Sequence, residues 1–242
     1  MTGVAPNPRL RVLAVSENGY SHVNKEIAFA HGMQNTMFGL GDPQMHNNKS
    51  SPYFLGGYFP DNQPATYFKP ALIQSKYKQL YYTPSKRLPL FQAVFHDSVI
   101  TTNHWLLDNL KLQNIQSDAE LLQMLYNVPP MVHLNLATSD TRIQYLLRID
   151  AFFRPLHERL AFQSLIDFEW LSNDRMVQAT KFQDGTKLIA NFGDQSYGLS
   201  SGYGRSQTCD FADQTCVEPH SIVALLKNGE VLRYKSGSIP TL

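Results

Sequence analysis

The 242-residue sequence lacks long hydrophobic runs, an excess of one charge and a leader-like start. No stretch approaches the roughly 18 consecutive apolar residues that a membrane-spanning helix needs. The 21 basic side chains are balanced by 20 acidic ones, so the chain has no basic field to hold a nucleic acid backbone. The first ten residues contain two prolines and no apolar segment, which argues against a secretory signal peptide. With 43% hydrophobic residues the chain is too apolar for disorder and long enough for one large domain or two smaller ones.

Cysteine is almost absent. The chain contains only Cys209 and Cys216, which are too few for a disulfide scaffold or a four-thiolate metal site. Their spacing is compatible with a local disulfide across a hairpin and with two free thiols, and we favour the free thiols.

Motifs that would indicate a cofactor or a metal are also missing. No glycine-rich loop opens a helix after a strand, which argues against a nucleotide cofactor, and no G-x-S-x-G elbow points to a serine hydrolase. No spaced pair such as H-E-x-x-H is present, so the sequence predicts neither a metal nor a cofactor. A competing metal site would have to draw on these scattered residues: His31, Asp42, His46, His96, Asp97, His104 and His133.

Strand-like and helix-like segments alternate up to about residue 163. Short apolar runs predict strands at 11–16, 88–100 and 132–136. Helices are expected at 21–32, 117–126 and 139–162, and the last shows the clearest helical period. Residues 32–85 have no long period and read as a functional loop.

From residue 164 onward the pattern changes to short strands. Asp184-Gly185 and Asn228-Gly229 are two-residue hairpin turns, which indicate an antiparallel meander. The expected strands are 168–170, 176–182, 187–192, 222–226 and 231–234. The predicted fold class is therefore α/β plus all-β, with a β/α domain at 1–163 and a small antiparallel β-sandwich at 164–242.

Polar groups follow or interrupt the three predicted strands of the β/α part. Glu17 ends the first strand, His96 and Asp97 end the second, and His133 and Asn135 lie in the third. Catalytic groups of β/α barrels collect at the carboxyl ends of the strands, where the following loops form one rim. Alternatively, Glu17 caps a turn and Asp97 is a hydrogen-bonded strand-end residue. Because the three strand ends occur together, we predict a shared site.

The loop after the second predicted strand adds His104, Trp105 and Asp108. A tryptophan beside carboxylates and histidines suits a sugar ring, although Trp105 could equally anchor the core under the loop. The loop at 32–85 contributes further aromatics, which either line a saccharide cleft or, as we expect for most of them, form the loop's own core. They are Tyr53, Phe54, Tyr58, Phe59, Tyr67 and Phe68.

Three segments resemble the carboxyl-terminal part of a large glycoside hydrolase, of the barrel glycosidases related to endo-α-N-acetylgalactosaminidases. They are Ser16–Gly19, Leu88–Asp97, and Lys181–Thr186 with Asn191–Gly193. The resemblance spans residues 11 to 195 in the same order. Its strand ending in His-Asp is moderately specific, and its Phe-x-Asp-Gly-Thr hairpin is weak alone.

The resemblance implies a (β/α)8 barrel followed by a β-sandwich, with two carboxyl groups that hydrolyse a glycosidic bond of an oligosaccharide or glycoconjugate. Glu17 matches the position of the general acid/base, and His96 and Asp97 would hold substrate hydroxyls. The full-length form would be secreted or periplasmic, although this chain carries no signal peptide of its own.

The chain departs from such an enzyme in one large respect. Only about three barrel strands are present, and the strands that carry the nucleophile have no counterpart. Three parallel strands cannot close a barrel. We therefore expect a fragment that lacks the amino-terminal barrel half and is nearly inactive alone, unless another chain completes it. Two further hypotheses are a catalytic pair formed by Glu17 and Asp97 and a non-catalytic carbohydrate-binding protein.

Overall fold

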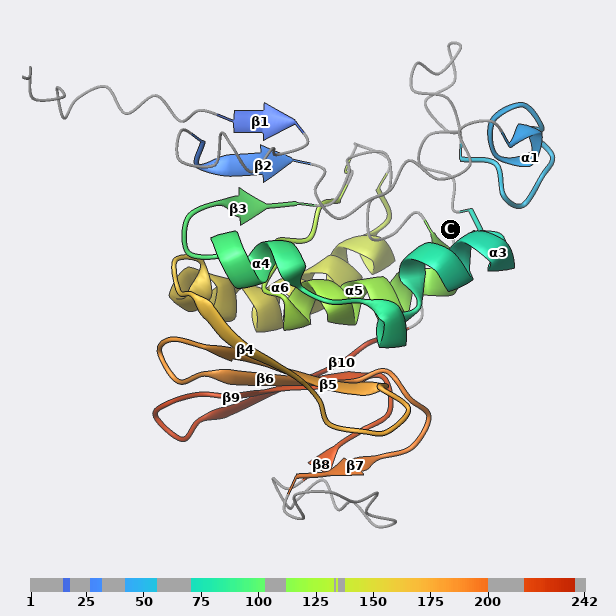
Figure 1. Cartoon of the computed structure of the whole chain (residues 1–242). Coiled ribbons are helices and arrows are strands. Elements are labelled where there is room, and N and C mark those ends of the chain that lie inside the picture. Colours follow the sequence, from blue (N-terminus) through green and yellow to red (C-terminus); the bar gives the residue numbers. More distant parts are fainter. Residues whose placement is uncertain are drawn as a thin grey trace, which may run out of the picture.

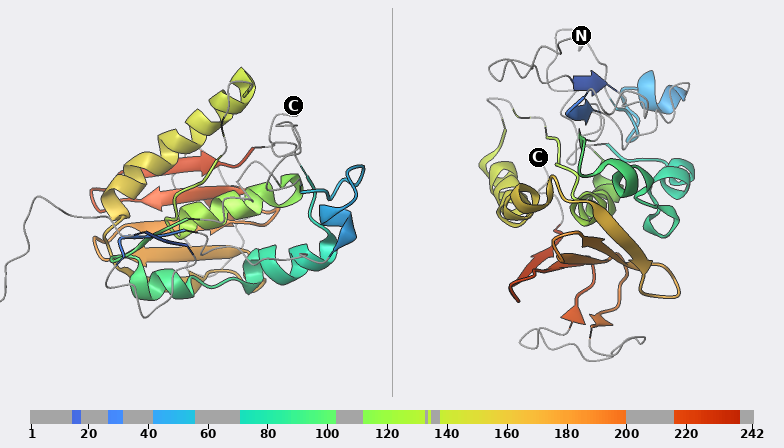
Figure 2. Two further views of the ribbon diagram at one scale, coloured as in Figure 1. Left: turned by 90° about the horizontal axis from the view of Figure 1, so that it is seen from above. Right: turned by 60° about the vertical axis from the view of Figure 1, so that its left-hand side comes forward.

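The computed structural model describes residues 15–17, 27–31, 42–55, 71–102, 112–132, 134, 138–199 and 216–237. These residues form a layered structure (Figure 1). A small parallel sheet lies on one side of a layer of helices, and an antiparallel sheet lies on the other. The right-hand view in Figure 2 shows the same order of layers. The chain is therefore a mixed helix and strand protein, as predicted.

The parallel sheet consists of β1 (Val15–Glu17), β2 (Phe29–His31) and β3 (Ile100–Thr101), in that order. Glu17 is the last residue of β1 and is paired in register with His31, the last residue of β2. The helix predicted at 21–32 is wrong where the structure describes it, because β2 occupies its end. A segment of three residues is too short to show the alternation of apolar and polar residues that identifies a strand in a sequence. β2 is a strand because it pairs in parallel with β1 on one side and β3 on the other.

The segment at 88–100 is not the continuous strand that we predicted. Leu90–Phe95 form helix α4, and only Ile100 and Thr101 at the end of the segment are a strand. A short apolar run suits a buried strand and a helix equally, since it shows neither period. Leu90 and Val94 are 70% and 65% exposed, so this helix is not the doubly buried element that the run suggested.

Helices α5 (Gln116–Leu125) and α6 (Asp140–Leu160) confirm two predictions. The Ser139 hydroxyl caps α6 by accepting a hydrogen bond from the Arg142 amide at 3.3 Å. The cap expected at Ser117 is wrong, because α5 begins one residue earlier, directly after the 3-10 turn η4 (Gln113–Ile115).

The carboxyl-terminal part forms a five-stranded antiparallel sheet in the order β10-β9-β6-β5-β4. Its strands are β4 (Leu165–Trp170), β5 (Val177–Phe182), β6 (Lys187–Asn191), β9 (Ser221–Leu225) and β10 (Val231–Lys235). Both predicted hairpin turns are confirmed: Gly185 and Gly229 have φ angles of +94° and +85°, which favour glycine.

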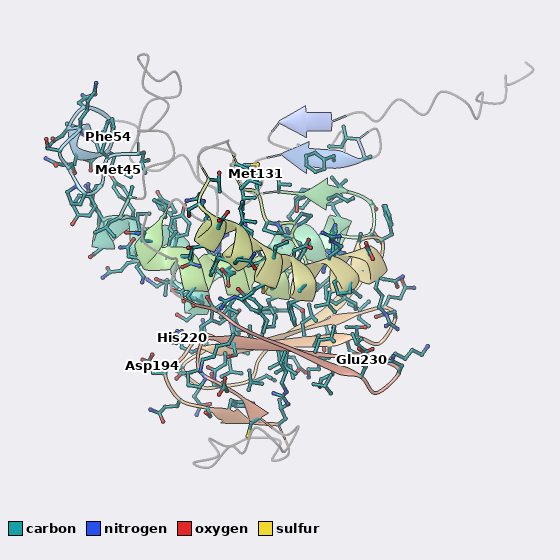
Figure 3. All side chains as sticks on the ribbon, turned by 180° about the vertical axis from the view of Figure 1, so that it is seen from behind. Met45, Phe54, Met131, Asp194, His220 and Glu230 are labelled. Carbon is teal, nitrogen blue, oxygen red and sulfur yellow. The ribbon has the colours of Figure 1, made fainter. Side chains whose placement is uncertain are left out.

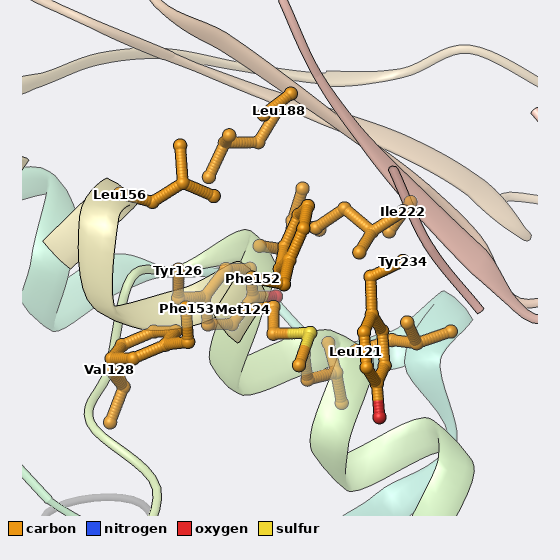
Figure 4. Close-up of a cluster of buried hydrophobic side chains, with 14 of the residues drawn as sticks. Leu121, Met124, Tyr126, Val128, Phe152, Phe153, Leu156, Leu188, Ile222 and Tyr234 are labelled. Atoms are coloured by element: carbon orange, nitrogen blue, oxygen red, sulfur yellow. The ribbon is translucent and has the colours of Figure 1, made fainter. Parts of the chain in front are cut away.

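The main hydrophobic core lies between the helices and one face of this sheet (Figure 4). Leu121 and Met124 of α5 and Phe152 and Leu156 of α6 meet Leu188, Ile222 and Tyr234 of the sheet. Segments on both sides of residue 163 thus share one core. The opposite face packs on the two-stranded β7–β8 (Tyr197–Gly198 and Cys216–Val217). The sheet's principal partner is therefore a layer of helices rather than the second sheet of the predicted β-sandwich.

Cys216 is disulfide-bonded, so the prediction of two free thiols is wrong. The sequence contains one other cysteine, Cys209, which lies outside the described residues. Cys216 is the first residue of β8, the strand that packs on the outer face of the large sheet.

A second, smaller cluster surrounds Met45 of α1 (Pro43–His46), away from the large sheet (Figure 3). The tyrosines of the following elements pack against it: Tyr77 of α3 (Ser75–Tyr77) and Tyr81 and Tyr82 of the π-helix η2 (Lys78–Tyr82). Tyr53 packs there too and Phe54 is buried, so these two aromatics serve the segment's own packing, as predicted. The other four predicted aromatics lie outside the described residues: Tyr58, Phe59, Tyr67 and Phe68.

Candidate functional site

The carboxyl edge of the parallel sheet is the candidate site. Glu17, His31 and Thr101 end the three strands at this edge, and the pairing of Glu17 with His31 places them at the same position along the sheet. Loops that follow parallel strands leave from this edge, and in β/α enzymes they carry the chemistry. Sequence reasoning found Glu17 but assigned His31 to a helix, because nothing in residues 29–31 indicates a strand.

Asp97 lies at the opposite end of this sheet. It precedes β3 in the turn after α4, whereas Glu17 is the final residue of β1 (Figure 1). The carboxylate of Asp97 accepts hydrogen bonds from the hydroxyls of Ser164, at 2.6 Å, and Ser98, at 2.7 Å. These bonds hold the pKa of Asp97 below its usual value, so this carboxyl is an ionised acceptor that ties the turn to the start of β4.

His96 is almost fully buried, at 7% exposure. Its Nδ1 donates to the backbone carbonyl of Gln163 at 2.7 Å, and its ring meets the edge of Phe182 with ring centres 5.1 Å apart. Burial lowers the pKa of His96. The side chain therefore joins α4 to the large sheet as a neutral imidazole, away from the carboxyl edge that Glu17 occupies.

A second histidine, His157, is half-buried and lies next to this junction. Nδ1 of His157 on α6 donates to Oδ1 of Asn127 at 2.8 Å, and Asn127 has the left-handed φ angle of +53° that asparagine tolerates. Burial, followed by the positive charge that His96 would carry, lowers the pKa of His157 to about 4.

The lowered pKa of His157 predicts that the folded protein is less stable in acid. A folded-state pKa below the unfolded value of about 6.5 means that stability is present above pH 6.5 and is lost as the pH falls toward 4. After allowance for solvent around the partly buried ring, we expect His157 to contribute about 2 kcal/mol to this loss. Urea unfolding at pH 7 and pH 4.5 measures it, with His157→Gln as the matched variant. An equal loss of stability in both proteins would refute the assignment.

Glu120 is a buried acid that sequence reasoning missed. It is 1% exposed and accepts hydrogen bonds from the hydroxyls of Tyr145 on α6 and Tyr234 on β10, and from Nε2 of Gln116 at 3.1 Å. Burial raises the pKa of Glu120, and the tyrosine hydrogen bonds oppose that rise. Nothing in the sequence singles out Glu120, because acidic residues are common in the first turns of helices. Its enclosure makes it a structural junction between α5, α6 and β10.

The remaining predicted site residues lie outside the described residues. They are His104, Trp105, Asp108, His133 and Asn135. The structure places Glu17 as the last residue of β1. Among the residues that the structure describes, no group of three histidine, cysteine, aspartate or glutamate side chains is placed to hold a metal ion. Within the same part of the chain, no helix is long and apolar enough to cross a bilayer.

Comparison with known protein families shows to which family the chain belongs. The sequence pattern of the glycosyl hydrolases related to the GH101 family, GH129, matches residues 1–181. The chain belongs to the GH129 family. The resemblance to a glycoside hydrolase of this related group is thereby confirmed, and the carboxyl edge with Glu17 lies within the matched segment.

Solved structures similar to this GH129 chain include the α-N-acetylgalactosaminidase NagBb from Bifidobacterium bifidum, as a quadruple mutant and as a GalNAc complex. Each is 19% identical with a TM-score of 0.41 over 75% of this chain. The chain spans only 22% and 23% of those two structures. No curated protein sequence matches it.

Proposed function

We propose that this GH129 chain is the carboxyl-terminal part of a glycoside hydrolase and that it supplies the general acid/base, Glu17, to a barrel completed by other strands. The observation that carries the proposal is the position of Glu17 at the carboxyl edge of a parallel sheet, within the segment that matches the family. An acid at this edge lies where β/α barrels collect catalytic groups.

In this mechanism Glu17 protonates the oxygen of the leaving group while a nucleophile from the missing strands attacks the anomeric carbon. Glu17 then removes a proton from the water that releases the sugar, because the same group acts as acid and base in a retaining enzyme. The step requires Glu17 to be protonated at the working pH, which an apolar setting at the end of a strand favours.

The proposed substrate is an oligosaccharide or glycoconjugate bound at the carboxyl edge. β3 ends at that edge with Thr101. We propose that His104, Trp105 and Asp108 of the segment after β3, together with His133 and Asn135, bind the sugar.

We expect the 242-residue chain alone to hydrolyse an aryl α-N-acetylgalactosaminide at no more than about 1% of the rate of the complete enzyme, because a single carboxyl group cannot perform both steps. The measurement compares the chain alone with the chain joined to its missing barrel strands. Full activity in the isolated chain would overturn the fragment proposal. Sugar binding without turnover in either form, lost in Trp105→Ala, would instead favour a carbohydrate-binding protein.

The full-length form is proposed to work outside the cytoplasm. The disulfide at Cys216 supports this, because structural disulfides persist in secreted and periplasmic proteins and are rare in reducing compartments.

A further inference from the structure

His31 lies beside Glu17 at the carboxyl edge of the parallel sheet. The two residues are the last of β2 and β1, and the parallel ladder pairs them in register. Neighbouring strands lie about 4.8 Å apart, and residues paired in register lie on the same face of a sheet. A glutamate and a histidine on one face at this spacing can reach each other for a hydrogen bond.

The face that the two residues share is the one opposite α4. Thr101 of β3 is 4% exposed, and its hydroxyl accepts a hydrogen bond from Nε2 of Gln92 on α4 at 3.5 Å. Ala30 of β2, which is paired with Thr101, is fully buried. Successive residues of a strand lie on opposite faces, so His31 is on the face away from α4, and its partner Glu17 is there too.

The backbone at His31 is held from both sides. β1 pairs with it on one side, and on the other the Thr102 amide donates a hydrogen bond to the Ala30 carbonyl at 3.2 Å, which continues the ladder past the end of β3. Phe29 and Ile100 lie on the same face as His31 and are only half-buried. A group on the middle strand of a ladder is held more precisely than one on a loop, which suits a residue that orients another.

Glu17 and His31 are the titratable residues of this part of the sheet. Within the four described elements β1, β2, β3 and α4, no other residue is acidic or basic. His96 and Asp97 follow α4 at the opposite end of the sheet, where they are bonded to the Gln163 carbonyl and to two serine hydroxyls. The charge that His31 meets along these strands is therefore that of Glu17.

We infer that His31 is a positioning residue of the acid/base, with its imidazole donating a hydrogen bond to the carboxyl group of Glu17, and the inference rests on the proposed function. Negative charge develops on Glu17 as its proton passes to the leaving oxygen. A donor held beside it stabilises that charge more than it stabilises the neutral acid. In the second step the same hydrogen bond keeps Glu17 ionised and oriented toward the water. His31 itself neither transfers a proton nor contacts the sugar.

The pairing is tested in the 242-residue chain, without turnover. The imidazole signals are titrated by NMR, and the signal of His31 is identified by its loss in His31→Gln. Since a carboxylate beside an imidazole favours the charged form of the ring, Glu17→Gln should lower the pKa of His31. His220 is the internal control. Its Nε2 is bonded to Asp194 at 3.0 Å beside the antiparallel sheet (Figure 3), and its pKa should be the same in both proteins.

The role in catalysis is tested in the complete enzyme. His31→Leu should lower kcat on a glycoside with a poor leaving group roughly 10- to 100-fold, the value of one hydrogen bond to a charged group, and should leave KM nearly unchanged. A glycoside whose leaving group departs without protonation should lose much less in its first step. His31→Gln keeps an N–H donor and should recover part of the rate.

Two results would overturn the inference. The first is an unchanged pKa of His31 in Glu17→Gln. The second is a rise in KM of equal size on both glycosides in His31→Leu, which would make His31 a sugar-binding residue. If the pKa of His31 falls in Glu17→Gln but the complete wild-type enzyme hydrolyses neither glycoside, the proposed function fails and the pairing of the two side chains stands.

Discussion

Replacing Glu17 with glutamine is expected to lower kcat/KM of the complete enzyme by about 10²–10⁴-fold on a glycoside with a poor leaving group. Glutamine keeps the shape of the side chain but cannot transfer a proton to the leaving oxygen. A glycoside whose leaving group departs without protonation should lose much less in its first step. This dependence on the leaving group separates a general acid from a residue that only binds sugar.

The pH profile gives a second readout for Glu17. In the proposed mechanism the alkaline limb of kcat/KM of the wild-type enzyme should report deprotonation of Glu17, and the Glu17→Gln variant should lose that limb. Glu230→Gln is the matched control, because Glu230 is an exposed glutamate in the turn between β9 and β10 (Figure 3). Unchanged turnover in Glu17→Gln would show that the assignment is wrong.

Asp97 distinguishes the two catalytic hypotheses. If Glu17 and Asp97 form the catalytic pair, Asp97→Asn should abolish turnover as completely as Glu17→Gln. The structure puts these residues at opposite ends of the parallel sheet, with Asp97 engaged by Ser98 and Ser164. We therefore propose Glu17 as the acid/base together with a nucleophile from other strands.

Glu120→Ala should have the largest effect on stability, a loss of about 4 kcal/mol in the free energy of unfolding. The substitution leaves a cavity and removes the shared acceptor of Tyr145, Tyr234 and Gln116 at a site that is 1% exposed. A loss of this size corresponds to a fall in Tm of roughly 10 °C for a chain of this length.

Glu158→Ala is the control for this prediction, because Glu158 is an exposed acid on α6 and should change stability by less than about 0.5 kcal/mol. Chemical denaturation of the 242-residue chain measures both variants. A loss below about 1 kcal/mol in Glu120→Ala would mean that the tyrosine hydroxyls find other partners, and that Glu120 does not hold the helices to β10.

Several elements could be predicted because their causes are local. Helix α6 begins after the capping residue Ser139, and its apolar residues recur with the helical period. The hairpins at Gly185 and Gly229 follow from the positive φ angles that their turns require. The position of Glu17 at the end of a strand followed from the apolar run before it.

Other elements depended on partners far away in the chain. Leu90–Phe95 form a helix although the segment reads as a strand, and Phe29–His31 form a strand only as the middle member of a parallel ladder. The first difference matters for function. Because the helix precedes β3, Asp97 lies at the amino edge of the sheet instead of the carboxyl edge.

The sequence by itself determined the family, the strands of the antiparallel sheet and the candidate acid Glu17, since motifs, turn residues and apolar period are properties of short segments. Only the tertiary structure decided which ends of the parallel strands meet, that Cys216 is disulfide-bonded, that Glu120 is enclosed by two tyrosines and that α6 keeps an open apolar face. These features arise from contacts between segments that are distant in the chain, and local propensity carries no information about such contacts.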